Sequence, residues 1–411
     1  MTATGDIVVP TRHTESDDPI LTPERLELVH RMRALGPAIA ERAAAHDLAA
    51  EFPHANWADF ADAGLLGICI PEADGGLGGD FVGYALASEE LGRYCGATAL
   101  TFNMHVATTL LTGQVADDLD LEPADLAHLH ANRAILREGV TQRQIIHSQP
   151  FSEGVSAGAT DGFSTKAVPV DGGYLVSGRK IFASLSGGAH VNNVACMVDG
   201  DPRVRLLGVP ADGDGVTIEG DWDPLGMRAT DSRTLVMDEV FVPAEHEWIP
   251  AGAFDQAAQR WPYFYMTLSF SYLGLMRAIM DDTAAYLIGN GGPSARRSHP
   301  IKQQGWAQMQ LIYERAQALC YRVLGEVGVD PSPAAVRRAW ASMVTTMDGA
   351  PELASLAMRV CGGRSLLRPS PLERYYRDAR CGATMLPWSV EVCLERLGRA
   401  DLFDDATASP S

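Results

Sequence analysis

His105 is a residue whose type and sequence context suggest chemistry. It lies in the apolar stretch ALTFNMHVATTLL, in which apolar residues recur at helical spacing. Histidine changes its charge closest to neutral pH, so His105 could accept or steer a proton. A histidine that is simply packed inside a helical domain fits the same pattern. The sequence leaves both interpretations of His105 open.

The cysteines give no metal or disulfide signal. No pair has the CxxC spacing of a zinc site, and their number is odd. We therefore expect small buried side chains in a reducing compartment and no metal centre. The seven are Cys69, Cys95, Cys196, Cys320, Cys361, Cys381 and Cys393.

Two further features bear on location. The N-terminal sequence MTATGDIVVPTRHTESDDP lacks the cationic and apolar regions of a secretory signal. No later run of about 18 or more apolar residues could span a membrane. We therefore expect a cytoplasmic protein that is not attached to a membrane.

The net charge argues against one class of partner. The 411-residue chain has 33 Lys and Arg against 52 Asp and Glu, a formal charge of -19. This charge repels a phosphate backbone, and no block of basic residues offsets it. Nucleic acid is therefore not an expected partner. A polyanionic coenzyme would need a local cationic or amide-rich patch.

The spacing of apolar residues divides the chain into blocks that must position any site. Residues 1–20 and 403–411 are polar and are predicted to be tails. Residues 21–145 have helical periodicity, and Thr22 followed by Pro23 is typical of a helix start. The glycine-rich stretch PEADGGLGGD at 71–80 does not follow a strand, so it is predicted to be a turn without a ligand.

After residue 145, the spacing of apolar residues changes twice. In residues 146–245, apolar residues recur with a period near two in short runs that are separated by Gly, Asp and Pro. This pattern predicts an antiparallel β domain. Residues 246–402 return to helical periodicity, which predicts a four-helix bundle. Helices and strands in separate blocks indicate an α+β fold. The four predicted bundle helices are 253–289, 300–327, 332–361 and 371–400.

Four segments between residues 22 and 400 have glycine and charge patterns that occur together in one flavoprotein family. They are DFADAGLLGICIPEADGGLGGDFVGYALASEELGR, FSEGVSAGATDGFSTKAVPVDGGYLVSGRKIFAS, PLGMRATDSRTLVMDEVFVP and RVCGGRSLLRPSPLERYYRDAR. In this order they resemble the N-terminal helical signature, the flavin-binding β segment, the closing β hairpin and the C-terminal helix pair of the acyl-CoA dehydrogenases. The resemblance implies three domains, with FAD held between the β domain and the bundle. It also implies a homodimer or homotetramer, because the adenine end of FAD reaches a neighbouring subunit.

The resemblance assigns cofactor contacts position by position. Phe151 and Ser152 fall where family members hold the flavin ring. Phe182 and Ser184 fall on the strand whose aromatic ring covers the flavin and whose hydroxyl bonds to it. A flavin needs such an apolar face with a few placed donors. Each of these residues alone is typical of an ordinary core or strand position.

The adenine half of FAD is assigned to the bundle. Gln303 matches a glutamine near the adenine, and Gly362 and Gly363 match glycines that let backbone approach the neighbour's diphosphate. The two glycines are equally typical of a helix C-cap. Two departures from the family pattern are residues 156–158, which replace a Gly-x-Gly-Ser order, and GNGGPSARRSHP, which lacks an Arg-x-x-Phe-Gly motif. Arg296 or Arg297 could replace the missing arginine, or both could be solvated loop charges.

The catalytic glutamate of the resembled family has no counterpart. Family members remove an α-proton with a carboxylate in one of two positions, and here these positions hold Leu386 and Phe264. No Asp or Glu occurs from 381 to 390 or from 256 to 280. Three explanations stay open: the base comes from another position, the reaction removes no α-proton, or the protein has lost its activity. The catalytic residue stays unknown, with His105 as a candidate.

Three functions remain open. The first is oxidation of an acyl thioester linked to CoA or a carrier protein, which RDARCGATMLP and LERLGR favour slightly by likeness to dehydrogenases. The second is a two-component monooxygenase or N-hydroxylase that receives reduced flavin from a reductase partner, which the missing glutamate favours. The third is a homologue without activity. Phe264, Tyr265, Leu386 and Trp388 predict an apolar, aromatic substrate cavity.

Overall fold

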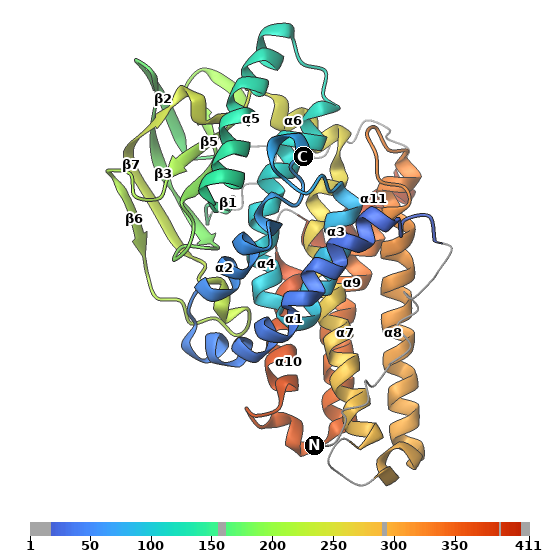
Figure 1. The fold of residues 1–411 in the computed structure, drawn as a ribbon. Coiled ribbons are helices and arrows are strands. Elements are labelled where there is room, and N and C mark those ends of the chain that lie inside the picture. Colours follow the sequence, from blue (N-terminus) through green and yellow to red (C-terminus); the bar gives the residue numbers. More distant parts are fainter. Residues whose placement is uncertain (1–17, 155–161, 290–293, 386–387, 404–411) are drawn as a thin grey trace.

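The computed structural model describes residues 18–154, 162–289, 294–385 and 388–403. Figure 1 shows a sheet on one side of the molecule, helices of the N-terminal block beside it, and long helices of the C-terminal block on the other side. The predicted α+β fold is confirmed. Leu386 and residues 156–158 lie outside the described residues. The division into domains at residues 145 and 245 stays a prediction.

The N-terminal block consists of helices. As the sequence predicts, the first begins at Pro23, where the Thr22 hydroxyl accepts a hydrogen bond from the Arg25 N–H at 3.4 Å. The glycine-rich stretch forms a turn between the second and third helices. A Cβ on Gly76 would lie 2.1 Å from the carbonyl oxygen of Ile70, so close backbone packing requires glycine there. The helices are α1 (Pro23–Ala49), α2 (His54–Asp62), α3 (Phe81–Tyr94), α4 (Gly96–Leu110) and α5 (Pro123–Arg143).

The middle block forms one eight-stranded sheet. Its strand order is β6-β7-β3-β2-β4-β5-β8, with β1 paired to β4. Most pairs are antiparallel, as predicted, while β1–β4 and β2–β4 are parallel. Alternate side chains of β3, β4 and β7 form a buried core of their own. The strands are β1 (His147–Ser148), β2 (Lys166–Val170), β3 (Gly173–Ala183), β4 (Val191–Val198), β5 (Asp201–Pro210), β6 (Val216–Glu219), β7 (Arg233–Pro243) and β8 (Glu247–Ile249).

The C-terminal block is a helical bundle in which two of the four predicted helices are interrupted. The first is broken by a 3-10 helix at Pro262–Met266, because Pro262 has no N–H to donate to the preceding turn. The last is broken between Cys381 and Ser389, where Ser389 caps a new helix. The helices are α6 (Ala253–Arg260), α7 (Thr267–Ile288), α8 (Pro300–Leu324), α9 (Pro333–Cys361), α10 (Pro371–Cys381) and α11 (Val390–Leu402).

The two helical blocks share one core, and α3 packs closely against α7. A Cβ on Gly274 would lie 2.0 Å from the carbonyl oxygen of Glu89, so the backbones touch at this crossing. Beside it, the buried Arg277 guanidinium pairs with Glu89 at 3.3 Å and with Glu90 at 3.4 Å. A buried cation with two carboxylate partners fixes the relative position of the helices.

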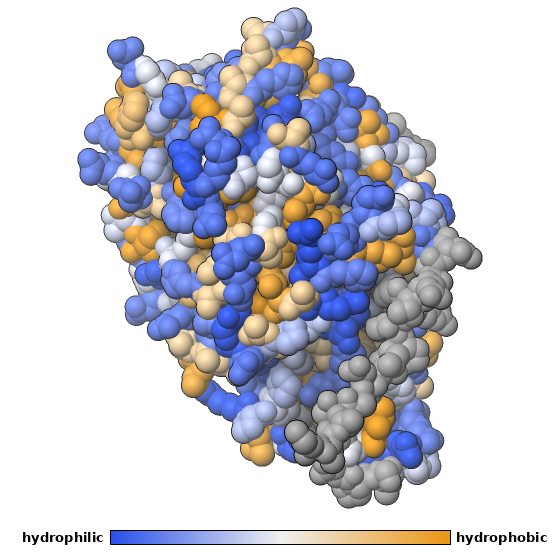
Figure 2. Space-filling view, viewed as in Figure 1, coloured by the Kyte–Doolittle hydropathy of each residue, from blue (hydrophilic) through white to orange (hydrophobic). Residues whose placement is uncertain are grey.

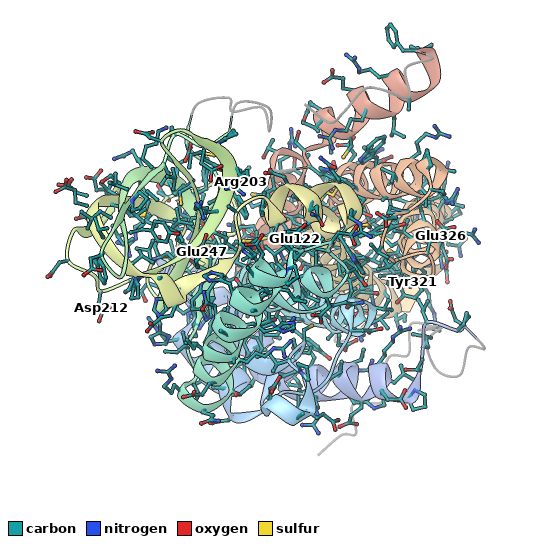
Figure 3. All side chains as sticks on the ribbon, turned by 90° about the horizontal axis from the view of Figure 1, so that it is seen from above. Glu122, Arg203, Asp212, Glu247, Tyr321 and Glu326 are labelled. Atoms are coloured by element: carbon teal, nitrogen blue, oxygen red, sulfur yellow. The ribbon has the colours of Figure 1, made fainter. Side chains whose placement is uncertain are left out.

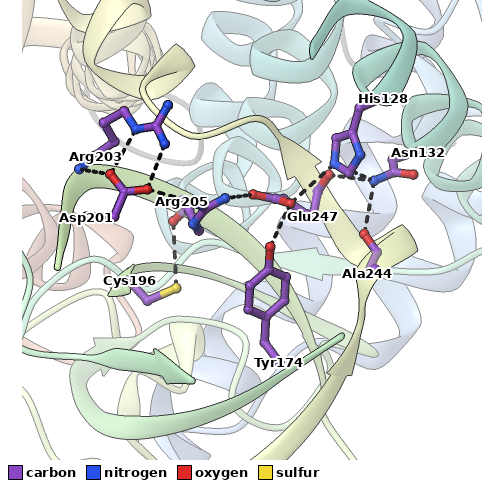
Figure 4. Close-up of polar contacts among 9 residues, drawn as sticks. All are labelled: His128, Asn132, Tyr174, Cys196, Asp201, Arg203, Arg205, Ala244 and Glu247. Atoms are coloured by element: carbon purple, nitrogen blue, oxygen red, sulfur yellow. Dashed lines mark hydrogen bonds and ion pairs between the residues drawn. The ribbon is translucent and has the colours of Figure 1, made fainter. Parts of the chain in front are cut away.

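A second polar network joins α5 to the sheet (Figure 4). The buried Glu247 carboxylate accepts hydrogen bonds from Arg205 at 2.6 Å and from the Tyr174 hydroxyl at 3.1 Å. His128 of α5 lies 3.4 Å from the same carboxylate, and the Asn132 amide donates to the Glu247 carbonyl oxygen at 2.9 Å. Seen from above, Glu247 lies where the sheet meets α5 (Figure 3). The network fixes the position of the sheet relative to the helices.

The surface is mixed in character. Figure 2 shows hydrophilic residues over much of one face, with apolar residues scattered between them. Scattered exposed apolar residues are ordinary on a folded protein. Among the described residues, none of the helices combines the length and the apolar character that a membrane span requires.

Candidate active site

The structure brings the first predicted flavin contacts together. The backbone N–H of Ile181 in β3 donates to the carbonyl oxygen of Ser152 at 2.7 Å. This bond places Phe151 and Ser152 beside the end of β3, which carries Phe182. Phe151 also packs against Phe254 of α6, with 5.5 Å between the ring centroids. The site therefore lies where the sheet meets the start of the C-terminal block.

Phe182 and Ser184 give this site an aromatic face and hydroxyl groups. The Phe182 side chain is 64% exposed, which is unusual for an aromatic residue, and its backbone has a left-handed φ of 53°. The Ser184 hydroxyl lies 2.8 Å from the Ser232 hydroxyl. An open ring beside two hydroxyls fits the apolar face and the polar edge of a flavin.

A buried ion pair joins Glu153, the residue after Ser152, to strand β3. Lys180 Nζ donates to Glu153 Oε1 at 2.6 Å, and both side chains are inaccessible to solvent. The carboxylate also accepts from the N–H and hydroxyl groups of Ser164 and Thr165 at 2.6–3.0 Å. Burial alone would raise the pKa of Glu153, but the bonds from Lys180 and Thr165 lower it to about 2. Glu153 is therefore a fixed anion and not a proton acceptor.

At the far end of the bundle, three cations surround Tyr286. The Arg296 and Arg364 guanidinium carbons lie 4.3 and 5.4 Å from its ring centroid, and Lys302 Nζ lies 5.0 Å from it. Lys302 also donates to the carbonyl oxygen of Val360 at 2.5 Å. Cations attract the face of an aromatic ring, but they repel one another. Their convergence suits a ligand with more than one negative charge.

The predicted adenine-half residues lie at this same end. Gln303 follows Lys302 in α8, and its amide donates to the Arg297 carbonyl oxygen at 2.9 Å. Gly362 has a φ of 73°, and a Cβ added to Gly362 or Gly363 would meet no atom within 4 Å. Open glycine backbone beside cations fits a diphosphate.

Phe264 and the cation cluster lie at opposite ends of α7. That helix runs from Thr267, close to Phe264, to Ile288, close to Tyr286. Its 22 residues span about 33 Å at 1.5 Å per residue. On one chain, Phe264 and the cation cluster are therefore separated by about the length of this helix.

One of the two predicted glutamate positions is described, and it is apolar. Phe264 lies in the 3-10 helix before α7 and is 8% exposed. Its ring lies 5.9 Å from Tyr265, whose ring in turn lies 5.8 Å from Trp388. Phenylalanine cannot accept a proton at any pH. This corner of the molecule is aromatic, and the substrate cavity predicted there stays a prediction.

His105 is fully buried, and both of its ring nitrogens are bonded to backbone. Nε2 lies 3.0 Å from the carbonyl oxygen of Leu66, and Nδ1 accepts the N–H of His147 at 3.1 Å. The neutral tautomer with hydrogen on Nε2 satisfies both bonds. Burial lowers the pKa of His105 to about 4. This geometry favours the structural interpretation, because no ring atom remains to act on a substrate.

Sequence reasoning overlooked two groups of charged residues. Glu153 and Lys180 lie within the segment quoted for the family resemblance, so that motif could have indicated them. Lys302 and Arg364 lie beside Gln303 and Gly363, which the resemblance did single out. No local pattern indicates that Tyr286 brings them together, since 16 and 78 residues separate Lys302 and Arg364 from it in the chain.

A sheet beside two helical blocks that share one core is the three-domain arrangement of the flavoprotein family that the sequence resembles. Family models agree. The acyl-CoA dehydrogenase N-terminal domain matches residues 22–114, the middle domain matches 151–240, and the C-terminal domain matches 258–386. The chain belongs to the acyl-CoA dehydrogenase superfamily.

Similar proteins include both dehydrogenases and other enzymes. The mitochondrial short-chain specific acyl-CoA dehydrogenase of Mus musculus is 25% identical, over 80% of this chain and 78% of its own. L-evernosamine nitrososynthase of a Micromonospora species is 28% identical, over 90% of this chain and 88% of its own. The X-ray structure of KijD3 in complex with FMN and a dTDP-linked amino sugar has a TM-score of 0.82 and 22% identity, over 96% and 98% of the two chains.

These comparisons support an enzyme that uses a flavin. The family consists of flavin-dependent oxidoreductases, and the chain is an acyl-CoA dehydrogenase-like flavoprotein. They leave open which flavin it binds and which reaction it catalyses.

Proposed function

We propose that this enzyme uses reduced flavin and oxygen to hydroxylate a small molecule, as a two-component monooxygenase or N-hydroxylase. The observation that carries the proposal is the absence of a proton acceptor where thioester oxidation needs one. Phe264 occupies one glutamate position, the sequence has Leu386 at the other, and His105 has both nitrogens bonded. Oxygen chemistry on a flavin needs a dry pocket and no strong base.

The protein's own residues would then bind and exclude water. Phe182 would cover one face of the ring, and the backbone and hydroxyl of Ser152 and the Ser184 hydroxyl would hold its polar edge. Phe264 and Tyr265 line an aromatic wall that keeps water away from the reacting atoms. The bound flavin supplies the electrons and the site of reaction with oxygen, and a reductase partner supplies the reduced cofactor.

Two proteins similar to this chain support the proposal by name. L-evernosamine nitrososynthase is named for nitrogen oxidation of an amino sugar, and KijD3 was solved with an amino sugar linked to dTDP. An amine is therefore the first substrate class to test, and the aromatic corner at Phe264 and Tyr265 makes an aromatic ring the second.

FAD is the flavin that the cation cluster favours. FMN has a single phosphate, whereas FAD has a diphosphate and an adenine that need a second binding region. Arg296, Lys302 and Arg364 beside Gly362 and Gly363 supply positive charge and open backbone for such a group. Because the length of α7 separates this cluster from Phe264 of the same chain, we propose that each FAD is shared between two copies in a homodimer or homotetramer.

The cofactor proposal can be tested by binding. Lys302→Gln and Arg364→Gln should each weaken FAD by about tenfold or more, because each removes a charge-assisted contact. Neither variant should change FMN affinity, and Arg315→Gln, an exposed α8 control, should change neither. Equal losses for FAD and FMN, or none for FAD, contradict the assignment.

Oxidation of an acyl thioester is the second candidate. Its support is the 25% identity with the mouse dehydrogenase over most of both chains. In that reaction a base outside the two usual positions would have to remove the α-proton.

One experiment separates the two candidates. Flavin-loaded protein is mixed without oxygen with acyl-CoAs from butyryl to palmitoyl. In parallel, it is supplied with NADH, a flavin reductase, isotope-labelled oxygen, and either indole or a dTDP-linked amino sugar. We expect no loss of visible flavin absorbance in the first arm and a product carrying labelled oxygen in the second. Bleaching by any acyl-CoA refutes the monooxygenase proposal.

A further inference from the structure

A chain of three hydroxyl groups leads from the interior to the proposed flavin site. The Thr230 hydroxyl donates to the carbonyl oxygen of Met227 at 2.9 Å, and its oxygen lies 2.7 Å from the Ser232 hydroxyl oxygen. The Ser232 oxygen in turn lies 2.8 Å from the hydroxyl oxygen of Ser184, one of the proposed ring contacts. Thr230 and Ser232 are both buried, so bulk water does not compete for these bonds.

The loop that carries these hydroxyls is fixed at both ends. The Met227 N–H donates to the buried Asp378 carboxylate at 2.5 Å, which ties the start of the chain to α10. At the other end, the Leu185 N–H donates to the carbonyl oxygen of Thr230 at 3.0 Å. Met227 has a left-handed φ of 54°, which is costly for a residue with a side chain and persists only where the surroundings enforce it. The three hydroxyls therefore keep their relative positions.

The direction of the hydrogen bonds in this chain is determined, because each hydroxyl has a single hydrogen. Thr230 uses its hydrogen on the Met227 carbonyl oxygen, so it can only accept from Ser232. Ser232 has then used its own hydrogen, so it can only accept from Ser184. Any other arrangement leaves two oxygens in contact with no hydrogen between them. The Ser184 oxygen therefore offers a ligand its lone pairs and no hydrogen.

An acceptor at this position distinguishes the two redox states of a flavin ring. The oxidised ring has its N–H at N3, between two carbonyl groups. Two electrons and one proton convert it to the reduced anion, and the proton makes N5 a donor as well. The N3 edge would also need donors for its two carbonyl oxygens, but the N–H groups of Ser184, Leu185 and Ser186 are already bonded to backbone carbonyls. The N5 edge is therefore the better match for Ser184.

From this geometry we infer that Thr230 and Ser232 fix Ser184 as an acceptor, so that the site prefers reduced flavin to oxidised flavin. Thr230 and Ser232 are positioning residues, because they act on the ring through Ser184. The inference rests on the proposed contact between Ser184 and the flavin ring. It does not depend on the reaction that follows, and it holds for FAD and FMN alike because their rings are identical.

The reduction potential of the bound flavin measures this preference. Dithionite titration of the full FAD-loaded chain with a reference dye gives the potential, and fluorescence titration gives the dissociation constant of oxidised FAD. Ser232→Ala and Thr230→Val should each free the Ser184 hydrogen, in the second case because Ser232 can then donate to Ser184. The freed hydrogen can bond to oxidised N5, so the preference for reduced flavin should fall about tenfold. A tenfold change lowers the potential by about 30 mV relative to the wild type.

Ser186→Ala is the matched control. The Ser186 hydroxyl belongs to the same turn as Ser184, but it donates to the carbonyl oxygen of Ala183 at 2.6 Å and lies outside the chain. Its removal should leave the potential unchanged. If Thr230 and Ser232 contributed to stability alone, their substitution would weaken both redox forms equally, and the potential would again stay unchanged. The potential therefore separates a positioning role from a structural one.

Three results overturn the inference. They are an unchanged or raised potential in Ser232→Ala, the same result in Thr230→Val, and a drop in Ser186→Ala as large as in the other two. Flavin content and thermal unfolding establish which variants fold, and if one of the first two does not, the other decides. None of these results changes the outcome of the acyl-CoA and labelled-oxygen experiment, so failure of this inference and failure of the proposed function are distinguishable.

Discussion

Replacing Lys180 by Met should destabilise the sheet and loosen the flavin contacts. Met keeps an apolar stem of similar length, but it leaves the Glu153 carboxylate buried without a cation. Removing one member of a buried ion pair costs about 3–5 kcal/mol. For 411 residues at about 2.1 cal/mol/K per residue, each kcal/mol shifts the melting temperature by about 1.2 °C, so it should fall by about 4–6 °C. Because Glu153 follows Ser152, the purified variant should also retain less flavin.

Two further variants make this prediction specific. Arg179 is the neighbour of Lys180, but it pairs with Glu219 on the surface, with side chains 55% and 47% exposed. Arg179→Met should therefore cost less than about 1 kcal/mol. Adding Glu153→Gln to Lys180→Met should recover part of the lost stability, because it removes the unpaired buried charge, although the amide NH2 group cannot accept a hydrogen bond from the Ser164 or the Thr165 N–H. Denaturant unfolding measures all three. A Lys180→Met loss no larger than that of Arg179→Met, or no recovery in the double variant, refutes the reasoning.

Three other outcomes follow from buried groups. The pKa of His105 is about 4 and that of His147 about 3, both lowered first by burial from the ordinary 6.5. Below about pH 6.5 the unfolded chain therefore binds more protons than the folded chain. The free energy of unfolding should be constant above pH 7 and fall between about pH 6.5 and 4, and the NMR signals of the His105 and His147 rings should stay unchanged down to about pH 5. Gly274→Ala should cost about 1–3 kcal/mol in denaturant unfolding, because its Cβ would lie 2.0 Å from the Glu89 carbonyl oxygen; an unchanged midpoint would contradict the close crossing. Glu247→Gln should cost about 1–3 kcal/mol and increase proteolysis at α5, since Arg205 keeps Asp201 but loses its buried carboxylate partner; wild-type resistance to protease would refute this role.

The sequence predicted the fold class because its periods are local properties. Helical spacing in the first and last blocks and alternation in the middle one each follow from which face of an element is buried. The helix start at Pro23 was predicted for the same reason, since a capping side chain and a proline act within one turn. Two bundle helices were predicted as continuous, although Pro262 is a local signal for the first of these breaks.

The sequence could not predict what each polar side chain would meet. His105 has the same local pattern whether it is a base or is packed, and the bonds that decide this come from Leu66 and His147, which lie 39 and 42 residues away. Likewise, the local sequence does not show that Arg296 and Arg364 both lie against the Tyr286 ring. Which groups are buried together depends on how distant elements pack.

The sequence by itself determined the order of helices and strands, the family, and the loss of a carboxylate at Phe264 and Leu386, because these depend on residue identity along the chain. Only the tertiary structure decided that His105 is neutral with both nitrogens bonded, that Glu153 is held as an anion by Lys180, and that Phe264 and the cation cluster lie at opposite ends of α7. Charge state and proximity are set by burial and by contacts across the fold, and neither is a property of local sequence.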